Sequence, residues 1–308
     1  MTAVTTTLTS KNMNYLAMNL KLPATQLADI AQDAAQNIGP YLLKSFKNPG
    51  PVSYKRDFHD IVTVHDQEAE RRIRETLFAA VPDSVILGEE EGRVIDANGN
   101  PASPDGKVMW LVDPIDGTSN FASGLPMWCI SIAAVQDDDV VAGVVYQPTT
   151  ELLWRADDTG ATLNGDPIQV AADMPVRESI IVVDFPYDRV TDYAGSCAGY
   201  QKMLNAAKSM RRHGSTALNL AQTAQGLYVG TMGMGTKPWD IGAGIALVRA
   251  AGGKFVAVKD SRERTEGRAF AQATYFACAN NEAAELFNSV IDSVAPQPLT
   301  TNYFGWED

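Results

Sequence analysis

The sequence predicts a mixed α/β (α+β) protein with two halves of different character, and two observations support this. Between residues 25 and 178, short strand-like segments are separated by polar turns such as Asp137-Asp138-Asp139, a spacing typical of antiparallel hairpins. Between residues 179 and 308, strand-like and helix-like segments alternate, which favours a mainly parallel sheet. Residues 1–24 lack periodicity and are expected to form a flexible N-terminal arm.

The composition is that of an ordinary globular protein and argues against several functional classes. The chain has 308 residues, 45% hydrophobic and 20% charged, so it can bury a substantial core. A net charge of -12 argues against nucleic acid as the main partner. No apolar run approaches the roughly 18 residues of a membrane helix, and the N-terminus does not resemble a secretion signal. The three widely spaced cysteines fit reduced thiols, so we expect a cytoplasmic location.

The first half is expected to begin with helices. Apolar side chains recur at helical spacing from Gln26 to Phe46, and Gly39-Pro40 within that segment predicts a kink or a break. A second helix is expected to open near Asp66, which lies where an N-cap or first-turn acid belongs. The expected strands are Ile61–Val64, Ser84–Leu87, Met109–Val112, Cys129–Val135, Val140–Tyr146 and Glu151–Ala156.

A Gly-rich segment, residues 230–237, interrupts the second half and is expected to be a loop. It leads to Asp240, which is expected to open a helix that ends at Gly252-Gly253. The remaining expected elements are strands at Ser179–Asp184, Lys254–Val258 and Thr274–Ala279, and helices at Tyr200–Ala207, Thr216–Gln225 and Glu282–Val290.

The stretch from Trp110 to Phe121 carries the strongest chemical signal. Its apolar strand ends in Asp113 and Asp116, and Gly117-Thr118 follows where the chain is expected to turn into a helix. Two acids directly after a buried strand are costly unless they bind something. Backbone N–H groups at a helix start bind phosphate well. We therefore expect metal ions at the carboxylates and a phosphate at the helix start.

Two other segments also deliver carboxylates at the end of an apolar strand or loop, namely Gly88-Glu89-Glu90 and Trp239-Asp240. Gathered carboxylates repel one another unless a cation lies between them, and oxygen-only ligands favour hard cations such as Mg²⁺. Two such ions about 3.5–4 Å apart could activate a water and stabilise the leaving oxygen in phosphoryl transfer. Simpler explanations exist for each segment: the Glu run can be a solvated turn, and Asp240 or Asp66 can be a helix cap.

At these residues the sequence resembles the inositol monophosphatase family of Mg²⁺-dependent, lithium-sensitive phosphatases. The resemblance runs from about Gln26 to the last helix and implies a layered α-β-α-β-α sandwich of the sugar phosphatase type. It also implies a homodimer. The matching motifs, in the order of the family, are Asp60–Glu70, Gly88–Glu90, Asp113–Phe121 and Lys237–Gly244.

The resemblance implies two to three Mg²⁺ ions per subunit, with Mn²⁺ able to substitute. Glu89 would also hold the third, weaker ion through water. The implied ligands of the first metal are Glu89, Asp113, Thr118 and the carbonyl of Ile115, and those of the second are Asp113, Asp116 and Asp240.

The reaction that the resemblance implies is in-line attack by a metal-activated water, without a phospho-enzyme. Thr118 and Asp66 would orient that water, and Glu90 would support them. The amides of Gly117 and Thr118 would hold the phosphate, with Asp116 beside it.

The match is weaker for the alcohol that carries the phosphate. Inositol-handling members of the family have a Glu seven residues before the Trp-Asp aspartate, and the corresponding residue here is Gly233. This difference predicts a roomier or different alcohol pocket. The segment Gly214-Ser215-Thr216 matches the other wall of the substrate site. Lys55 matches a loop lysine that influences metal binding in the family, and a solvated surface role is its alternative.

We therefore expect a Mg²⁺-dependent phosphomonoesterase for a small phosphorylated polyol or sugar, with inositol 1-phosphate as the best guess. The same chemistry on a 3′-phosphoadenosine nucleotide, NADP, histidinol phosphate or fructose 1,6-bisphosphate is the alternative. A non-catalytic regulatory binding protein is a third reading, which a full set of metal carboxylates supports poorly.

Overall fold

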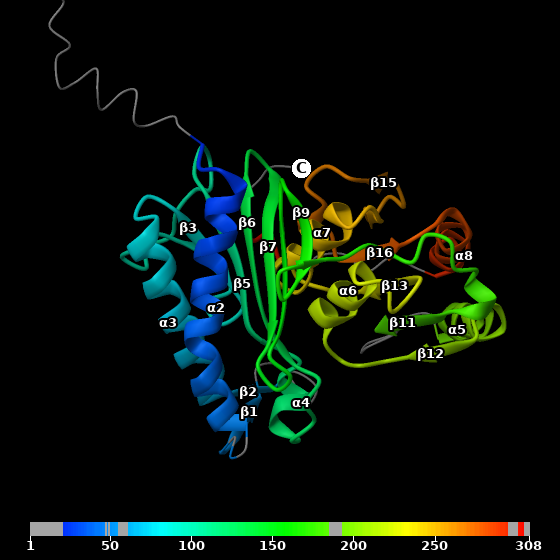
Figure 1. The fold of residues 1–308 in the computed structure, drawn as a ribbon, viewed down its shortest axis with the longest axis horizontal. Coiled ribbons are helices and arrows are strands. Elements are labelled where there is room, and N and C mark those ends of the chain that lie inside the picture. Colours follow the sequence, from blue (N-terminus) through cyan, green and yellow to red (C-terminus); the bar gives the residue numbers. More distant parts are fainter. Residues whose placement is uncertain are drawn as a thin grey trace, which may run out of the picture.

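Five layers of helices and sheets make up the part of the chain that the computed structural model describes, which is residues 21–46, 48, 50–54, 61–184, 193–294 and 301–304. Figure 1 shows them side by side: α2 and α3, an eight-stranded sheet, α6 and α7, a six-stranded sheet, and α5 and α8. The predicted α-β-α-β-α sandwich is confirmed.

The eight-stranded sheet has the order β10-β9-β8-β7-β6-β5-β3-β4, and all its neighbours are antiparallel except β3 and β5. The predicted hairpins are therefore confirmed. A separate pair, β1 and β2, is also antiparallel. The strands are β1 Val52–Tyr54, β2 Ile61–Thr63, β3 Val85–Gly88, β4 Val94–Ile95, β5 Met109–Asp116, β6 Cys129–Gln136, β7 Asp139–Gln147, β8 Leu152–Asp157, β9 Gly160–Leu163 and β10 Asp166–Pro167.

The six-stranded sheet, of order β12-β11-β13-β16-β14-β15, is mixed, so the prediction of a mainly parallel sheet is wrong. Only β11 pairs in parallel, with β12 and with β13. Strands β13 and β14 run the same way around helix α7, as the alternation predicted, but β16 lies antiparallel between them. The strands are β11 Ile180–Asp184, β12 Ser209–Arg211, β13 Gly230–Met234, β14 Lys254–Val258, β15 Arg264–Thr265 and β16 Thr274–Cys278.

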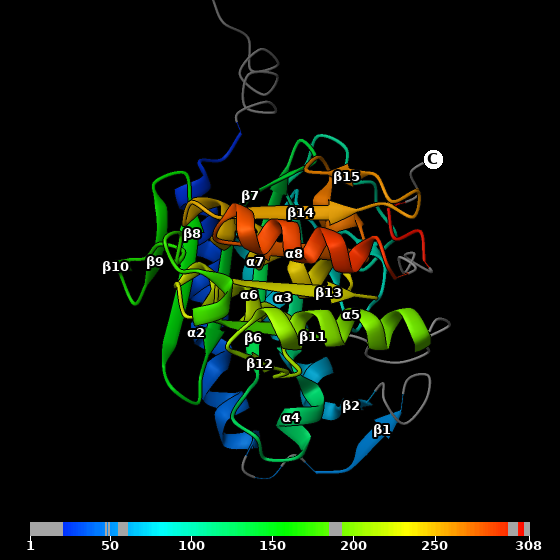
Figure 2. The same cartoon turned by 90° about the vertical axis from the view of Figure 1, so that its right-hand side faces the viewer.

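Helices α6 and α7 fill the space between the sheets, and α7 packs on both β7 and β14. Figure 2 shows α5 and α8 over the outer face of the second sheet. The helices are α2 Ala24–Phe46, α3 Val64–Ala80, α4 Thr118–Ala122, α5 Tyr193–Ala206, α6 Thr216–Ala224, α7 Pro238–Ala250 and α8 Asn281–Ile291, with 3₁₀ turns at Val176–Glu178 and Ala269–Ala271.

Two local predictions meet the effect of packing. Helix α2 continues through Pro40, so the predicted alternative of a break is wrong, while that of a kink stays a prediction; the helix packs closely on the first sheet, where a Cβ at Gly39 would lie 2.6 Å from the Tyr146 ring. The Gly-rich segment begins as strand β13, not as a loop, because β11 and β16 bond to both of its edges. Tertiary contacts override local propensity in both cases.

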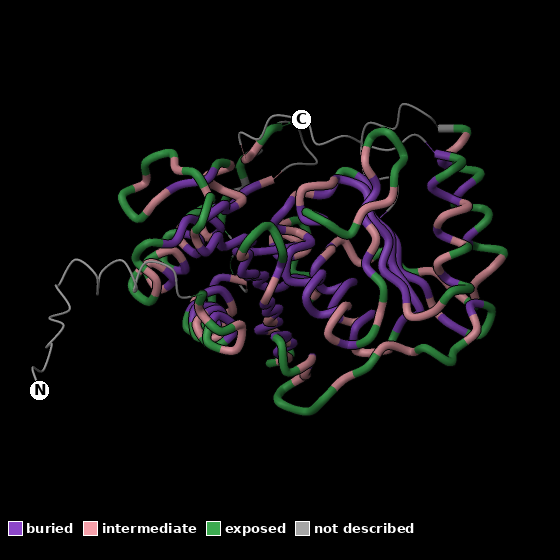
Figure 3. The backbone as a smooth tube through the Cα atoms, turned by 90° about the horizontal axis from the view of Figure 1, so that it is seen from above, coloured by how far each residue is buried: buried purple, intermediate pink, exposed green. Residues whose placement is uncertain are grey.

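Burial follows the layers, as Figure 3 shows: the strands are largely buried, whereas the outer helices alternate between buried and exposed faces. One apolar cluster lies between α2, α3 and the first sheet, a second between the two sheets, and a third under α8. No helix in the described parts of the chain combines the length and apolar character needed to cross a membrane.

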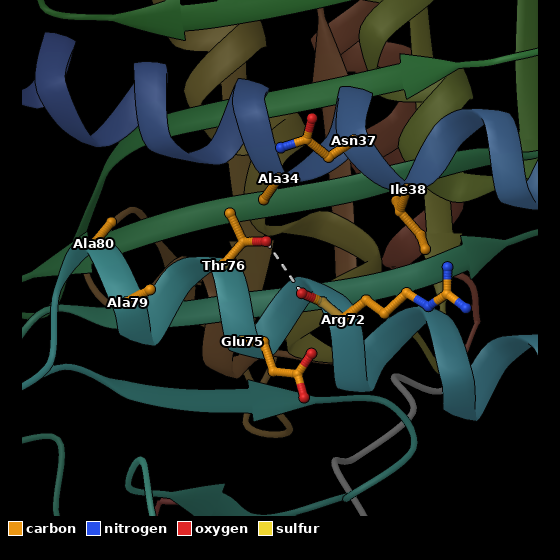
Figure 4. A pocket seen from close by; sticks show the side chains of 8 residues that line it. All are labelled: Ala34, Asn37, Ile38, Arg72, Glu75, Thr76, Ala79 and Ala80. Carbon is orange, nitrogen blue, oxygen red and sulfur yellow. Dashed lines mark hydrogen bonds between the residues drawn. The ribbon is translucent and has the colours of Figure 1, made fainter.

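A surface groove runs between α2 and α3 (Figure 4). The Thr76 hydroxyl lies 3.2 Å from the Arg72 carbonyl along its floor. Ala34, Asn37 and Ile38 of α2 face it from the other side. None of the predicted site residues lines this groove, so it is not part of the candidate site.

Candidate active site

The first acids of the site lie together because two neighbouring strands are parallel. Strands β3 and β5 pair in register as far as Gly88 and Val112, and the Glu89 amide continues the ladder with a 3.1 Å hydrogen bond to the Val112 carbonyl. Their carboxyl ends therefore place Glu89 beside Asp113, and these two side chains are in hydrogen-bond contact. Burial, and then the charge of Glu89, raises the pKa of Asp113 well above its usual value.

Asp240 reaches the same cluster from the N-terminus of α7. One of its carboxylate oxygens accepts the Lys237 amide at 2.8 Å, so Asp240 caps its helix, as the simpler explanation proposed. It also faces Asp116 and Glu89, whose charges add to burial in raising the pKa of Asp240. The cap and the site are therefore served by the same carboxylate.

Asp66, like Asp240, caps a helix and also reaches the site, where it contacts Thr118. Asp66 is the third residue of α3, where it accepts the Thr63 amide at 2.8 Å with one oxygen. Its other oxygen lies 3.1 Å from the Thr118 hydroxyl, which is also 3.0 Å from the Ile115 carbonyl. The single hydroxyl hydrogen can serve only one of these acceptors at a time. Burial raises the pKa of Asp66 to about 6.

Asp116 joins the two halves of the chain. Its carboxylate accepts the Ser215 hydroxyl and the Ala217 amide, each at 2.6 Å, at the start of α6. Burial raises the pKa of Asp116 to about 7, against the lowering effect of these two donors. The predicted substrate wall at Ser215 is thus attached directly to a predicted metal ligand.

Gly117 forms the tight turn that follows these acids. Its φ of +99° lies in the left-handed region, and a Cβ there would lie 2.9 Å from the Met127 carbonyl. The same Cβ would lie 3.2 Å from the Gly214 carbonyl, so the two predicted phosphate and substrate segments touch here. Asn120 holds them together by donating to the carbonyls of Met127 and His213 at 2.6 and 2.7 Å.

The donor set has the chemistry of a site for hard cations. All the groups are oxygens, and burial together with the charges of neighbouring acids raises the pKa values of Asp113, Asp116 and Asp240, so their ionised forms are disfavoured. Within the described ranges, no three His, Cys, Asp or Glu side chains already converge as metal ligands do. Their own hydrogen bonds to Ile115, Ser215, Ala217 and Lys237 hold them in a looser group. A divalent cation fits this set because it would offset the repulsion.

The structure does not test every predicted site residue. Lys55 lies outside the described residues. The Glu90 amide donates to Glu70 at 2.8 Å, but the supporting role predicted for the Glu90 side chain stays a prediction. Gly233 lies on β13, where a Cβ would lie 2.6 Å from the Tyr275 ring. The space directly beside this position is therefore filled by Tyr275, and the predicted roomier or different alcohol pocket stays a prediction.

Sequence reasoning missed two acids. Glu70, on α3, is 2% exposed and accepts the amides of Glu90 and Glu91, which fixes the turn that carries Glu89. Asp184 ends β11 and is 6% exposed. The signal for Asp184 was present, because it follows an apolar strand just as Asp113 does.

Comparison with known proteins shows where this architecture belongs. Residues 24–295 match the Inositol monophosphatase family. The Inositol-1-monophosphatase of Synechocystis is 35% identical over 226 residues, which cover 73% of this chain and 76% of the relative. The Nus factor SuhB of Escherichia coli is 34% identical over 230 residues, covering 74% and 83%. The solved extragenic suppressor protein suhB from Bartonella henselae has a TM-score of 0.76 at 27% identity, covering 87% of this chain and 99% of that one.

The layered fold and the carboxylate cluster thus define a phosphatase of mixed α/β architecture. More specifically, the chain belongs to the inositol monophosphatase family, whose members are generally metal-dependent.

Proposed function

We propose that this protein is a Mg²⁺-dependent phosphomonoesterase that hydrolyses a small phosphorylated polyol or sugar, such as inositol 1-phosphate. The observation that carries the proposal is the grouping of Glu89, Asp113, Asp116 and Asp240 next to Gly117-Thr118. Mg²⁺, when bound to these acids, would lower the pKa of the attacking water and neutralise charge on the phosphate and on the leaving oxygen.

Asp66 is the residue suited to accept the proton of the attacking water. Its carboxylate lies beside the Thr118 hydroxyl, and its pKa of about 6 is close enough to neutrality for a general base. The Ile115 carbonyl would help to hold a cation, and the Thr118 hydroxyl, which lies between that carbonyl and Asp66, would then donate to Asp66 and be able to accept a hydrogen bond from the water. This pair would orient the water for in-line attack.

The backbone around Gly117 is suited to hold the phosphate. Helix α4 has only five residues, so its dipole adds little, and the donors are the local N–H groups of the turn. The Asn120 side chain donates a hydrogen bond to the His213 carbonyl, which ties this turn to the segment before α6. A phosphate bound at the turn would therefore lie at a fixed distance from the start of α6.

A phosphate-release assay on a panel of phosphomonoesters, with Mg²⁺, with Mn²⁺ and with a chelator, tests the proposal. We expect turnover that requires a divalent cation and is fastest for a polyol or sugar phosphate. The absence of turnover on every ester would refute it, and would favour the regulatory alternative that the name Nus factor suggests for the SuhB relatives. The homodimer and the cytoplasmic location stay predictions, and sedimentation of the full chain would test the first.

A further inference from the structure

Asp184 lies beside Gly233, the glycine at which the family's substrate-binding Glu is absent, on the neighbouring strand. It is the last residue of β11, and its Cα is in register with Gly233 of the parallel strand β13. Gly233 is in turn in register with Tyr275 of β16. Residues in register on adjacent strands project to the same face of a sheet, so Asp184 and Tyr275 flank Gly233 on one face.

This face is turned toward the active site. Tyr275 packs in the apolar cluster that α6 and α7 share with the two sheets, and its ring stacks on Phe255 with centroids 5.1 Å apart. The Asp184 carboxylate contacts the start of α6: the Gly214 amide donates to it at 3.4 Å, and the Thr216 hydroxyl also bonds to it. Both Gly214 and Thr216 belong to the predicted substrate wall.

Asp184 and Asp116 hold the same turn from two sides. Asp116 accepts Ser215 and Ala217, whereas Asp184 accepts Gly214 and the side-chain amide of Asn219. Asp116 belongs to the acid group proposed for the metals. The contacts of Asp184 at Gly214 and Asn219 thus flank those of Asp116 at Ser215 and Ala217.

The surroundings of Asp184 contain buried polar atoms with few partners. The Tyr275 and Thr231 hydroxyls contact each other, and beyond that contact neither they nor Asn219 Oδ1 has a hydrogen-bond partner within the described residues. Tyr275 is 0% exposed, and Asp184 is the acid whose charge acts on it most strongly. Buried polar atoms are rarely left unpaired, so this group points to hydroxyl groups or water that complete it.

We propose that Asp184 accepts hydrogen bonds from the hydroxyl groups of the substrate alcohol, with Tyr275 beside it, and thereby selects phosphorylated polyols. The carboxylate that is absent at residue 233 would thus be supplied by the adjacent strand. The inference rests on the proposed phosphatase function. A carboxylate suits this task because it accepts from neighbouring hydroxyls and disfavours a second phosphate at the same place.

The test compares Asp184→Asn with the natural protein on two substrates. Inositol 1-phosphate offers hydroxyl groups, whereas p-nitrophenyl phosphate offers none. We expect KM for inositol 1-phosphate to rise roughly 10- to 100-fold in the variant, as for the loss of hydrogen bonds to a charged group. For p-nitrophenyl phosphate, which has no hydroxyl groups to bind Asp184, we expect the loss in kcat/KM to be at least about threefold smaller than for inositol 1-phosphate.

Asp157→Asn is the matched control, because Asp157 is also buried at a strand end and hydrogen-bonded but lies in the ion pair with Arg155. It should not change the preference between the two substrates. An equal loss on both substrates in Asp184→Asn would show that Asp184 only supports the turn, and would overturn the inference.

Deoxy analogues of inositol 1-phosphate keep the inference testable if Asp184→Asn does not fold. The natural protein should hydrolyse at least one of them with a KM roughly tenfold higher. Equal KM values for all analogues would overturn the inference while leaving the phosphatase proposal intact. Failure to hydrolyse any ester, p-nitrophenyl phosphate included, would overturn both.

Discussion

Asp66 and Asp240 each combine two functions in one side chain. Both are the third residue of a long helix, and both accept the amide of the residue before that helix at 2.8 Å. A carboxylate has a second oxygen, which in Asp66 faces Thr118. The helix cap therefore orients the acid for the site, so the two explanations that the sequence left open are compatible.

Asp240→Asn should abolish activity without unfolding the protein. The amide oxygen can still cap α7, and one of several mutually repelling charges is removed. We expect kcat to fall by about 10²–10³-fold, as when one group that stabilises developing charge is removed. Initial rates at saturating Mg²⁺ and a thermal melt measure both effects. A variant with nearly natural rates would show that Asp240 is only a helix cap.

Gly233→Ala should destabilise the protein. The new Cβ would lie 2.6 Å from the Tyr275 ring, which is stacked on Phe255 and cannot move aside cheaply. Overpacking of this kind costs about 1–3 kcal/mol, measurable by urea denaturation. Gly267→Ala is the control, because a Cβ there approaches nothing closer than Thr265 Oγ1 at 4.0 Å. Equal stability of the two variants would contradict this assignment of space.

The turn after β3 is held in place by hydrogen bonds to a side chain of helix α3. Glu70 of α3 accepts the amides of Glu90 and Glu91 at 2.8 and 3.2 Å, and any side chain at Gly88 would collide with the Glu70 carboxylate. The position of this turn therefore depends on the position of helix α3. Since α3 also carries Asp66, a single helix sets two parts of the site.

Glu70→Gln should weaken activity through the position of this turn. A neutral amide keeps the shape but offers one good acceptor instead of two. We expect Mg²⁺ affinity or activity to fall roughly 10- to 100-fold, as is usual when a group behind metal ligands is changed. Titration of activity against Mg²⁺ measures it. Glu75→Gln, which alters an exposed acid on the same helix, should change nothing, and a similar loss in both variants would refute the role of Glu70.

Elements with strong periodicity could be predicted from the sequence, whereas strand neighbours could not. The hairpins β6 to β8 and the helix α3 follow their apolar spacing, and α6 and α7 begin and end near the predicted start and stop residues. The insertion of β16 between β13 and β14 depends on contacts far apart in the chain, which local pattern does not encode. Asp113 and Asp240 could be identified because each lies in a short sequence motif. Asp184 also follows an apolar strand, but no motif marks it, and its place beside Gly233 on another strand is visible only in the structure.

The buried acids with raised pKa values make the stability of the whole molecule depend on pH. Burial raises the pKa of Asp66 to about 6 and those of Asp116 and Glu70 to about 7, with Asp113 and Asp240 raised as well. Between the unfolded value near 4 and these values, the folded chain binds more protons than the unfolded chain. The free energy of unfolding must therefore fall as pH rises through this window.

We expect Tm in a chelator to decrease from pH 5 to pH 8, and Mg²⁺ to raise Tm more at pH 8 than at pH 5. The cation binds the ionised acids, so its effect grows as they lose protons. Thermal melts at both pH values, with and without Mg²⁺, measure this. A Mg²⁺ effect that is equal at both pH values would contradict the assignment of these carboxylates as the binding groups.

The insertion of β16 beside β13 has a consequence for redesign. The groups proposed to choose the alcohol, Asp184 and Tyr275, belong to the second sheet, whereas most acids proposed for the chemistry belong to β5 and its neighbours. The two sets are joined by hydrogen bonds at the start of α6, and their charges also act on one another. Substrate preference could therefore be changed by joint exchange of three adjacent strand positions, 184, 233 and 275, while the hydrolytic groups stay untouched.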